Sequence, residues 1–428
     1  MHISFFVIRI SQLVCGRGTV SEALKHRSKP VEEIPSGFLA FSEIKRPVVF
    51  WNVTRKCNLR CVHCYISASP SPATATSVFA AGKSGTAAEA GKEVEEELST
   101  EEAKAFIEDL AAMRIPLLMF TGGEPLVRRD FFEIAEYANA LRLKTALSTN
   151  GTLISESVAS RLRECGIEYV GISLDGASEQ THDEFRAQQG SFKKALQGLK
   201  NCVEAGLKTG IRFTVTRFNY KELPALIELA LSLKVPRFCV YWLVPSGRGS
   251  EIYEQQLKHA EVLEILNFLY RKALELSGKM EILTVDAPQD AVFFLQKLKE
   301  DGLNEAYESG LKLLEFMGDA CSAGERVANV DPVGNIYPCQ FAQMPALKVG
   351  NVRERKFSEI WNDPKNEILR AFREKQERLK GACRTCEFKQ ICGGGCRIRA
   401  LSAFGDIWAE DPLCPLTEQA KAKKGEGM

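Results

Sequence analysis

Three cysteines stand close together near the amino end of the chain, in the run Cys57-Asn-Leu-Arg-Cys61-Val-His-Cys64. Clustered cysteines in a cytosolic chain are more often metal ligands than disulfide partners. Three thiolates at this spacing can hold one [4Fe–4S] cluster and leave its fourth iron free for an outside ligand. The alternative is a zinc site with His63 as the fourth ligand. Closed zinc sites usually take paired ligands from two separate turns, so the spacing favours the iron–sulfur cluster.

A second set of cysteines occupies the last quarter of the chain. Its members are Cys321, Cys339, Cys383, Cys386, Cys392, Cys396 and Cys414. The glycine run 393–395 lets the backbone pass close to a bound cluster. The pair Cys383-x2-Cys386 is also a common zinc knuckle, so zinc is the alternative here, but a neighbouring iron–sulfur site favours iron–sulfur. The other cysteines are predicted to be small buried hydrophobes: Cys15, Cys165, Cys202 and Cys239.

The overall composition is that of an ordinary soluble protein. The 428 residues are 45% hydrophobic and 26% charged. The 56 Lys and Arg side chains against 55 Asp and Glu give a net charge of +1, which argues against a protein that coats nucleic acid or an anionic membrane. No apolar run reaches the roughly 18 residues that a membrane helix needs. We therefore predict a cytoplasmic protein with no nucleic-acid or membrane partner.

Strands and helices alternate through most of the first 280 residues. The predicted strands are Val48–Val53, Pro116–Phe120, Thr145–Thr149, Tyr169–Leu174, Gly210–Thr216 and Arg237–Leu243. The predicted helices are Arg129–Leu141, Ile154–Cys165, Phe192–Ala205, Lys221–Leu233 and Ala260–Leu276. Six βα units predict a parallel sheet covered by helices, as a partial barrel or a doubly wound sheet. Chemistry in such folds lies at the carboxyl ends of the strands, and the first cysteine loop follows such an end.

Composition also divides the chain into regions. The predicted regions are an N-terminal extension 1–46, an α/β core 47–280, a helical linker 281–318 and a small cysteine-rich domain 319–428. Within the core, residues 68–97 have almost no large apolar side chains, so we expect a flexible insertion there. Ser99 and Glu102 resemble a capping box that starts a helix directly after it.

The pattern CxxxCxxC after the first strand of a βα repeat resembles the radical S-adenosylmethionine (SAM) superfamily, in which His63 would occupy the place of an aromatic residue. A second motif, Thr121-Gly-Gly-Glu-Pro125, directly follows the second strand. The resemblance implies a partial (β/α)6 barrel in which Gly122, Gly123 and Glu124 receive the SAM amino group. Glycine backbone allows close approach, and a carboxylate can pair with an ammonium group.

The resemblance implies further cofactor contacts at the later strand ends. Polar residues near the SAM ribose and carboxylate would be Ser148, Asn150, Ser173, Asp175, His182 and Arg186. Each of them alone could equally cap a helix or form a surface pair. In this family a reduced cluster cleaves SAM to methionine and a 5′-deoxyadenosyl radical, which abstracts a substrate hydrogen. A low-potential donor such as ferredoxin or flavodoxin would supply the electron.

The C-terminal cysteine pattern resembles the SPASM extension of radical SAM enzymes, which carries one or two auxiliary [4Fe–4S] clusters. The interleaved ligation of that family would assign one cluster to Cys383, Cys386, Cys392 and Cys414. It would assign the other to Cys321, Cys339 and Cys396. The fourth ligand of this second cluster is not visible in the motif. A non-cysteine ligand, an open iron or a directly bound substrate all fit the pattern.

Several further segments resemble the tetrapyrrole-modifying subgroup, which includes the didecarboxysirohaem deacetylase and haem d1 biosynthesis enzymes. They are Gly16–Phe41, Leu243–Gly249, Leu283–Asp286, Gly350–Trp361 and Gly405–Pro412. Cys339 and Cys396 depart from this subgroup, where both positions are often not cysteine. A substrate with several carboxylates needs arginines, and Arg212, Arg217 and Arg248 are the candidates. The alternatives are a maturase of a ribosomal peptide or protein, and a non-catalytic zinc or iron–sulfur protein.

Overall fold

The computed structural model describes residues 46–70, 96–276, 279–317 and 321–416. The predicted N-terminal extension, apart from Arg46, and most of the predicted insertion 68–97 therefore lie outside the described residues, as does Cys15. Within the described part, no helix is long and apolar enough to cross a membrane.

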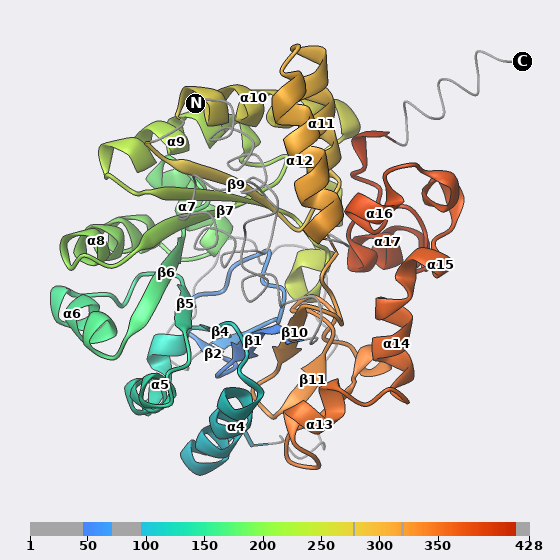
Figure 1. Ribbon diagram of the computed structural model, residues 1–428. Coiled ribbons are helices and arrows are strands. Elements are labelled where there is room, and N and C mark those ends of the chain that lie inside the picture. The colour runs from blue at the N-terminus through green and yellow to red at the C-terminus, as the bar shows by residue number, and fades with distance from the viewer. Residues whose placement is uncertain (1–45, 71–95, 277–278, 318–320, 417–428) are drawn as a thin grey trace, which may run out of the picture.

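A ten-stranded sheet runs through the centre of the molecule, in the order β12-β11-β10-β1-β4-β5-β6-β7-β8-β9 (Figure 1). All pairs from β10 to β9 are parallel, while β11 and β12 add antiparallel strands at one edge. The strands of this sheet are β1 (Val48–Asn52), β4 (Leu118–Thr121), β5 (Thr145–Thr149), β6 (Ile167–Ser173), β7 (Thr209–Val215), β8 (Arg237–Trp242), β9 (Glu281–Val285), β10 (Val327–Val330), β11 (Asn335–Tyr337) and β12 (Gly350–Asn351). The short strands β2 (Lys56–Cys57) and β3 (Ser69–Pro70) pair with each other in a separate sheet.

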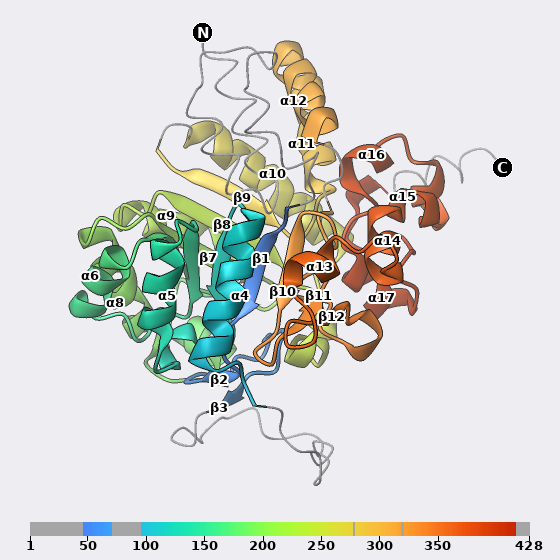
Figure 2. The same cartoon turned by 60° about the horizontal axis from the view of Figure 1, so that its bottom comes forward.

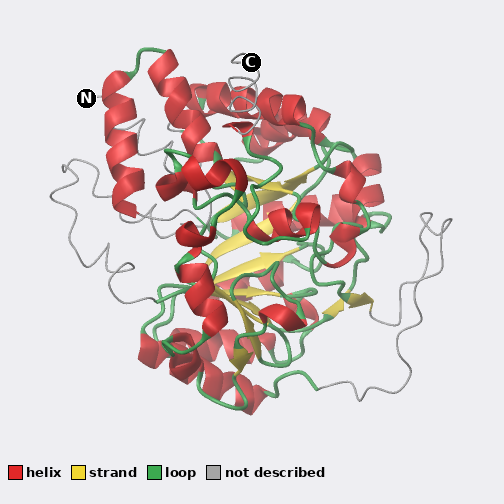
Figure 3. Cartoon of the chain, turned by 90° about the vertical axis from the view of Figure 1, so that its right-hand side faces the viewer, coloured by secondary structure: helices red, strands yellow, loops and turns green. Residues whose placement is uncertain are grey.

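Helices surround the strands, as Figure 3 shows in red around yellow. They are α4 (Thr100–Met113), α5 (Phe131–Ala140), α6 (Glu156–Glu164), α7 (Glu179–Arg186), α8 (Ser191–Glu204), α9 (Leu223–Ser232), α10 (His259–Glu275), α11 (Asp290–Glu300), α12 (Asn304–Met317), α13 (Phe357–Trp361), α14 (Glu367–Arg373), α15 (Lys375–Arg378), α16 (Lys389–Cys392) and α17 (Arg397–Phe404). The six predicted strands are confirmed as β1 and β4 to β8, and the five predicted helices as α5, α6, α8, α9 and α10.

The structure corrects the prediction that residues 281–318 are helical throughout. This segment begins with β9, which pairs in parallel with β8, and only then continues into α11 and α12. The strand β10 was not predicted either, and it lies parallel to β1. Both strands form because an edge of the core sheet offers unpaired backbone groups to them, and short apolar runs do not reveal such a partner. The C-terminal region is thus continuous with the core sheet (Figure 2).

The core of the molecule lies between the sheet and its helices. Trp51 of β1 is fully buried, with its ring 5.5 Å from that of Phe106 on α4 and 6.1 Å from that of Phe120 on β4. Burial of each such side chain contributes about 1.5–3 kcal/mol. The predicted capping box at the start of α4 is confirmed, because Ser99 and Glu102 exchange side-chain-to-backbone hydrogen bonds. The packing of β1, β4 and α4 against one another fixes the positions of the ends of β1 and β4, where the pocket lies.

Candidate active site

A pocket lies at the carboxyl ends of the parallel strands and encloses about 1060 Å³ of space, including its solvent-facing mouth. Its wall includes the three clustered cysteines and polar residues that end β4, β5 and β6. Gln340 and Phe341, which follow Cys339 in the C-terminal region, close another side. The pocket is therefore shared between the core and the cysteine-rich region.

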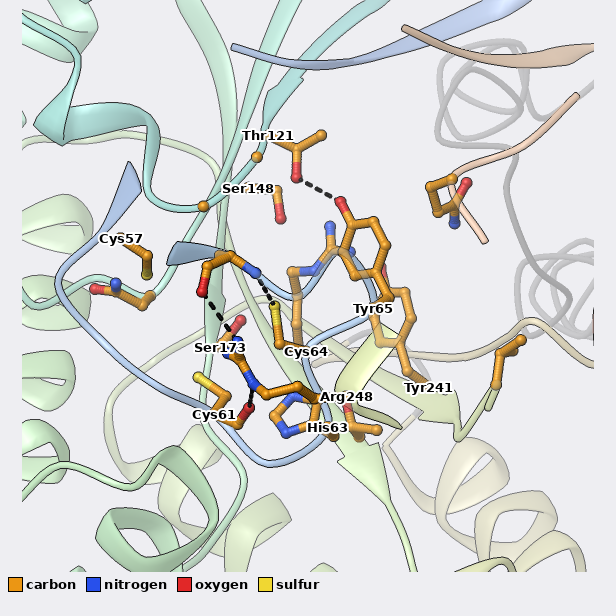
Figure 4. Close-up of a pocket in the computed structure, with 18 of the residues that line it drawn as sticks. Cys57, Cys61, His63, Cys64, Tyr65, Thr121, Ser148, Ser173, Tyr241 and Arg248 are labelled. Carbon is orange, nitrogen blue, oxygen red and sulfur yellow. Dashed lines mark hydrogen bonds between the residues drawn. The ribbon is translucent and has the colours of Figure 1, made fainter. Parts of the chain in front are cut away.

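The side chains of Cys57, Cys61 and Cys64 meet at this pocket (Figure 4). Each sulfur accepts an N–H group: Cys57 from the backbone of Leu59 at 3.3 Å, Cys64 from the backbone of Ala68 at 3.4 Å, and Cys61 from Arg186 at 3.4 Å. Burial raises the pKa of Cys57 to about 12, and the neighbouring thiol of Cys61 adds to the shift. Two buried thiols and a half-buried one, which repel each other as thiolates, fit a site where bound iron would supply the positive charge.

The arrangement does not support zinc at this site. Among the described residues, no set of three or more Cys, His, Asp or Glu side chains is arranged to hold a single metal ion. A [4Fe–4S] cluster takes each cysteine on a different iron, so its ligands lie further apart. The ring of His63 stacks on Phe185 with centroids 4.3 Å apart, and its Nε2 lies 3.9 Å from the Asp175 carboxylate. Its Nδ1 is buried and has no hydrogen-bond partner within the described residues.

The glycine motif after β4 packs directly on the cysteine loop. The backbone N–H of Gly123 donates to the carbonyl of Thr54 at 2.8 Å, and that of Glu124 donates to the carbonyl of Lys56 at 2.9 Å. Gly122 has φ +138°, where a side chain is strained. Both glycines line the pocket. The motif thus aligns the β4 end with Cys57, which follows Lys56.

Glu124 was predicted to contact the SAM amino group, but its side chain lies behind the pocket wall. It is fully buried and is absent from the pocket wall. Its Oε1 accepts from the Thr149 hydroxyl at 2.7 Å, and its Oε2 accepts from the Asn150 backbone at 2.8 Å. Burial raises the pKa of Glu124, and these hydrogen bonds oppose the shift. In this structure the carboxylate ties the end of β4 to the end of β5, and its contact with SAM stays a prediction.

The other predicted cofactor residues separate into two groups. Ser148, Asn150, Ser173 and Arg186 line the pocket. Asp175 and His182 are buried behind it, where the Asp175 backbone N–H donates to His182 Nδ1 at 3.1 Å. Burial, and then the charge of Arg186, lowers the pKa of His182 well below its ordinary value, so this imidazole is neutral.

The structure also separates the three candidate arginines. Arg217 lies at the surface and pairs with Glu261 at 3.1 Å. Arg248 lines the pocket, but its guanidinium donates to the carbonyls of Cys61 at 3.0 Å and Ala68 at 2.9 Å, so it braces the cysteine loop. Arg212 lines the pocket over the ring of Tyr241, 4.4 Å from its centroid. Within the described chain Arg212 has no carboxylate at ion-pair distance, although its charge acts on the buried Asp286 and Asp175.

Three pocket residues were missed as site candidates. The Tyr65 hydroxyl contacts Thr121 and Asn52 at 3.2 and 3.1 Å, and the Tyr65 ring lies beside Tyr241 in Figure 4. Asp286 follows β9 with φ +69°, a strained conformation for a residue with a side chain. Burial raises the pKa of Asp286 to about 7, and Arg399 and Arg212 oppose the shift. Polar residues at strand ends were the criterion for site candidates, and Asp286 directly follows β9. Because the sequence did not predict β9, Asp286 was not identified.

The C-terminal cysteines lie near one another in two groups, and the ligand assignment stays a prediction. Burial raises the pKa of Cys392 to about 12, with the nearby thiols of Cys383 and Cys386 contributing. Burial raises the pKa of Cys414 too, with contributions from Cys392 and Cys383. In the other group, burial raises the pKa of Cys339 and the thiols of Cys396 and Cys321 add to it. The remaining cysteines are buried as predicted: Cys165, Cys202 and Cys239.

A buried ion pair joins this C-terminal region to the pocket. Arg399 and Asp411 are both fully buried, with Nε and Nη2 of the arginine 2.8 and 2.7 Å from the two carboxylate oxygens. Arg399 also donates to the carbonyl of Asp286 at 2.7 Å, and Asp411 accepts from the backbone of Cys396 at 2.7 Å. One pair therefore connects the end of β9 with a predicted cluster ligand.

We expect Gly123→Ala to disturb the cysteine loop. A Cβ at this position would lie 2.1 Å from the carbonyl oxygen of Lys56, so the backbone before Cys57 must move. The change should lower the free energy of unfolding by about 1–3 kcal/mol and reduce the iron bound per chain after reconstitution. Urea unfolding and iron analysis measure both. Gly206→Ala, with φ +75° but open space around it, is the control that should keep its iron; full iron in Gly123→Ala would contradict the expectation.

Known proteins resemble this chain over almost its full length. The family model for the radical SAM superfamily matches residues 51–230, and the SPASM model, an iron–sulfur cluster-binding domain, matches residues 321–387. Fe-coproporphyrin III synthase of Methanosarcina barkeri is 39% identical over 96% of this chain and 98% of that protein. Pre-heme d1 synthase of Dinoroseobacter shibae is 38% identical over 87% of each. Mycofactocin maturase MftC of Mycolicibacterium smegmatis is more distant, at 32% over 85% of this chain and 81% of that protein.

Solved structures show the same fold. Streptococcus suis SuiB bound to S-adenosylmethionine superposes with a TM-score of 0.63 at 17% identity, over 90% of this chain and 81% of that one. Native anSMEcpe with bound AdoMet gives 0.61 at 19% identity, over 88% of this chain and 98% of that one. At such identities the likeness concerns the arrangement of the chain alone.

Proposed function

The chain belongs to the radical SAM superfamily and carries a SPASM domain, and on that premise we propose that it removes or modifies side chains of a sirohaem-derived tetrapyrrole. The reaction would be like that of 12,18-didecarboxysirohaem deacetylase, in alternative haem or haem d1 biosynthesis. Membership of the family makes the protein an enzyme that depends on [4Fe–4S] clusters and SAM. The observation that carries the choice of substrate is the likeness to Fe-coproporphyrin III synthase over almost the whole of both chains.

The bound cluster and SAM supply the radical chemistry, and the chain's own residues supply position and exclusion of water. We assign Cys57, Cys61 and Cys64 to the cluster that binds SAM, because their sulfurs share one pocket. Arg248 holds the cysteine loop closed through the carbonyls of Cys61 and Ala68. The rings of Tyr65 and Tyr241, which line the same pocket, offer the flat, apolar surface that a macrocycle requires.

Product analysis tests the proposal. The full chain would be reconstituted with iron and sulfide without air, reduced, and mixed with SAM and didecarboxysirohaem. We expect 5′-deoxyadenosine together with a tetrapyrrole that has lost side-chain mass. An unchanged tetrapyrrole beside active SAM cleavage would reject the substrate but not the family. A peptide that gains a modification under the same conditions would favour the maturase alternative instead, in line with the more distant relative MftC.

We expect Arg212→Gln to weaken tetrapyrrole binding and spare SAM cleavage. A hydrogen bond to a charged group contributes about 1.5–3 kcal/mol, so the dissociation constant for the tetrapyrrole should rise about 10- to 100-fold. Difference absorption titration measures the binding, and 5′-deoxyadenosine formed without substrate measures the cleavage. Arg217→Gln is the matched control, because Arg217 already pairs with Glu261 at the surface. Equal tetrapyrrole affinity in the two variants would remove Arg212 from the substrate site.

A further inference from the structure

We propose that Arg186 and Asp175 form an oriented ion pair that raises the reduction potential of the SAM-binding cluster through a hydrogen bond to the sulfur of Cys61. This inference rests on the cluster that the family requires and is independent of the tetrapyrrole substrate. It gives Arg186 a positioning and electrostatic role in addition to its predicted contact with SAM.

The contact to sulfur joins residues that are far apart in the chain. Nη1 of Arg186 donates to Sγ of Cys61 at 3.4 Å, and Arg186 lies at the end of α7. The backbone N–H of Val62 donates to the carbonyl of Phe185 at 3.1 Å, which fixes this helix end against the cysteine loop. The guanidinium is therefore held at the sulfur by its helix and is not a mobile surface group.

Asp175 contacts the other terminal nitrogen of the Arg186 guanidinium and completes the pair. Its Oδ2 contacts Nη2 of Arg186, and its Oδ1 accepts from the backbone of Thr214 at 2.6 Å. Asn219 donates to the Asp175 carbonyl at 3.0 Å. Asp175 is 0% exposed and Arg186 only 7% exposed, so solvent screens their charges little. Arg186 thus donates to Cys61 through one terminal nitrogen and contacts Asp175 through the other, so the cation is the member of the pair that touches the sulfur.

The pair acts on the cluster only when the Arg186 guanidinium is protonated and the Asp175 carboxyl is ionised. An arginine guanidinium stays protonated in proteins, and Asp175 is in contact with it. Burial raises the pKa of Asp175, and the charge of Arg186 and the hydrogen bond from Thr214 oppose that shift. His63 and His182 also lie close by: Nε2 of His63 is 3.9 Å from Oδ2 of Asp175, and Nδ1 of His182 accepts from the Asp175 backbone at 3.1 Å.

The direction of the effect follows from the charge that reduction adds. One electron makes the cluster and its thiolates more negative, and a buried N–H cation at one thiolate favours that state. Nε of Arg186 has no hydrogen-bond partner within the described chain, so the same guanidinium keeps one donor for a bound ligand. Removing the cation should lower the potential. Removing only its carboxylate partner should raise it, because the cation is then no longer compensated.

The test is a redox titration of the reconstituted full chain without SAM, followed by electron paramagnetic resonance. The SAM-binding cluster is identified as the component of the spectrum that shifts when SAM is added afterwards. In Arg186→Gln, the ratio of reduced to oxidised cluster at the wild-type midpoint should fall about tenfold, a shift of about 59 mV for one electron. In Asp175→Asn the same ratio should rise. The reduction potential of the SAM-binding cluster in Arg186→Lys should lie between the values for wild type and Arg186→Gln.

The control is Arg237→Gln, which removes an arginine paired with Glu281 at 2.8 Å at the opposite end of the sheet and should leave the potential unchanged. The auxiliary-cluster signals should also stay in place in every variant. A potential that does not fall in Arg186→Gln, or that moves in the same direction in Asp175→Asn, would overturn the proposal. If Arg186→Gln does not fold, the reduction potential of Asp175→Asn decides the question. A higher potential than wild type supports the proposal, and an equal or lower potential refutes it.

Discussion

Replacing Cys61 with alanine should reduce the formation of 5′-deoxyadenosine from SAM by at least about 100-fold. Cys61 is one of three sulfurs at the pocket and also accepts the hydrogen bond of Arg186, so its loss removes a ligand and leaves one N–H group of a buried guanidinium without its acceptor. The measurement is chromatographic analysis of the reduced, reconstituted variant incubated with SAM, together with its iron content.

Two further cysteine variants separate cluster loss from misfolding. Cys202→Ala removes a fully buried thiol of α8 outside the pocket and should keep wild-type cleavage. Cys386→Ala should disturb an auxiliary cluster while some cleavage of SAM remains. Equal and complete loss in Cys61→Ala and Cys386→Ala would indicate a folding defect and would contradict separate roles for the two sites.

Arg399→Ala should lower the free energy of unfolding of the iron-free chain by about 3–5 kcal/mol. The substitution leaves Asp411 as an uncompensated carboxylate in a fully buried position. It also removes the donors to the carbonyls of Leu243 and Asp286, which directly follow β8 and β9. Because Asp411 accepts from the backbone of Cys396, the auxiliary site should lose iron as well.

Urea unfolding and iron analysis check this second prediction. The matched control is Lys380→Ala, which breaks an exposed pair with Asp406 at 2.7 Å and should cost no more than about 1 kcal/mol. An Arg399→Ala chain that unfolds at the wild-type urea concentration would show that the pair adds nothing to stability. An Arg399→Ala chain of wild-type stability that has lost iron would show that the Arg399–Asp411 pair acts only on the auxiliary cluster site.

Several elements of the fold could be predicted because their signals are local. Trp51 and its apolar neighbours predicted β1, and Ser99 with Glu102 predicted the start of α4. The segment after Met280 could not be assigned in this way. Its five-residue strand β9 pairs only with β8, and its sequence alone does not distinguish a short strand from a helix. The parallel pairing of β10 with β1 spans about 280 residues and leaves no local trace.

The sequence by itself determined the spacing of Cys57, Cys61 and Cys64 and the glycine motif after the second strand, because a loop of a few residues limits how far apart its side chains can lie. Only the tertiary structure decided which arginine faces the pocket, where Asp286 lies and that Arg186 contacts Cys61. These three outcomes depend on distant strands and on the competing partners that each charge finds when it is buried. A guanidinium with a surface carboxylate nearby, as at Arg217, pairs there, whereas Arg212 lies among aromatic rings, with no carboxylate at ion-pair distance within the described chain.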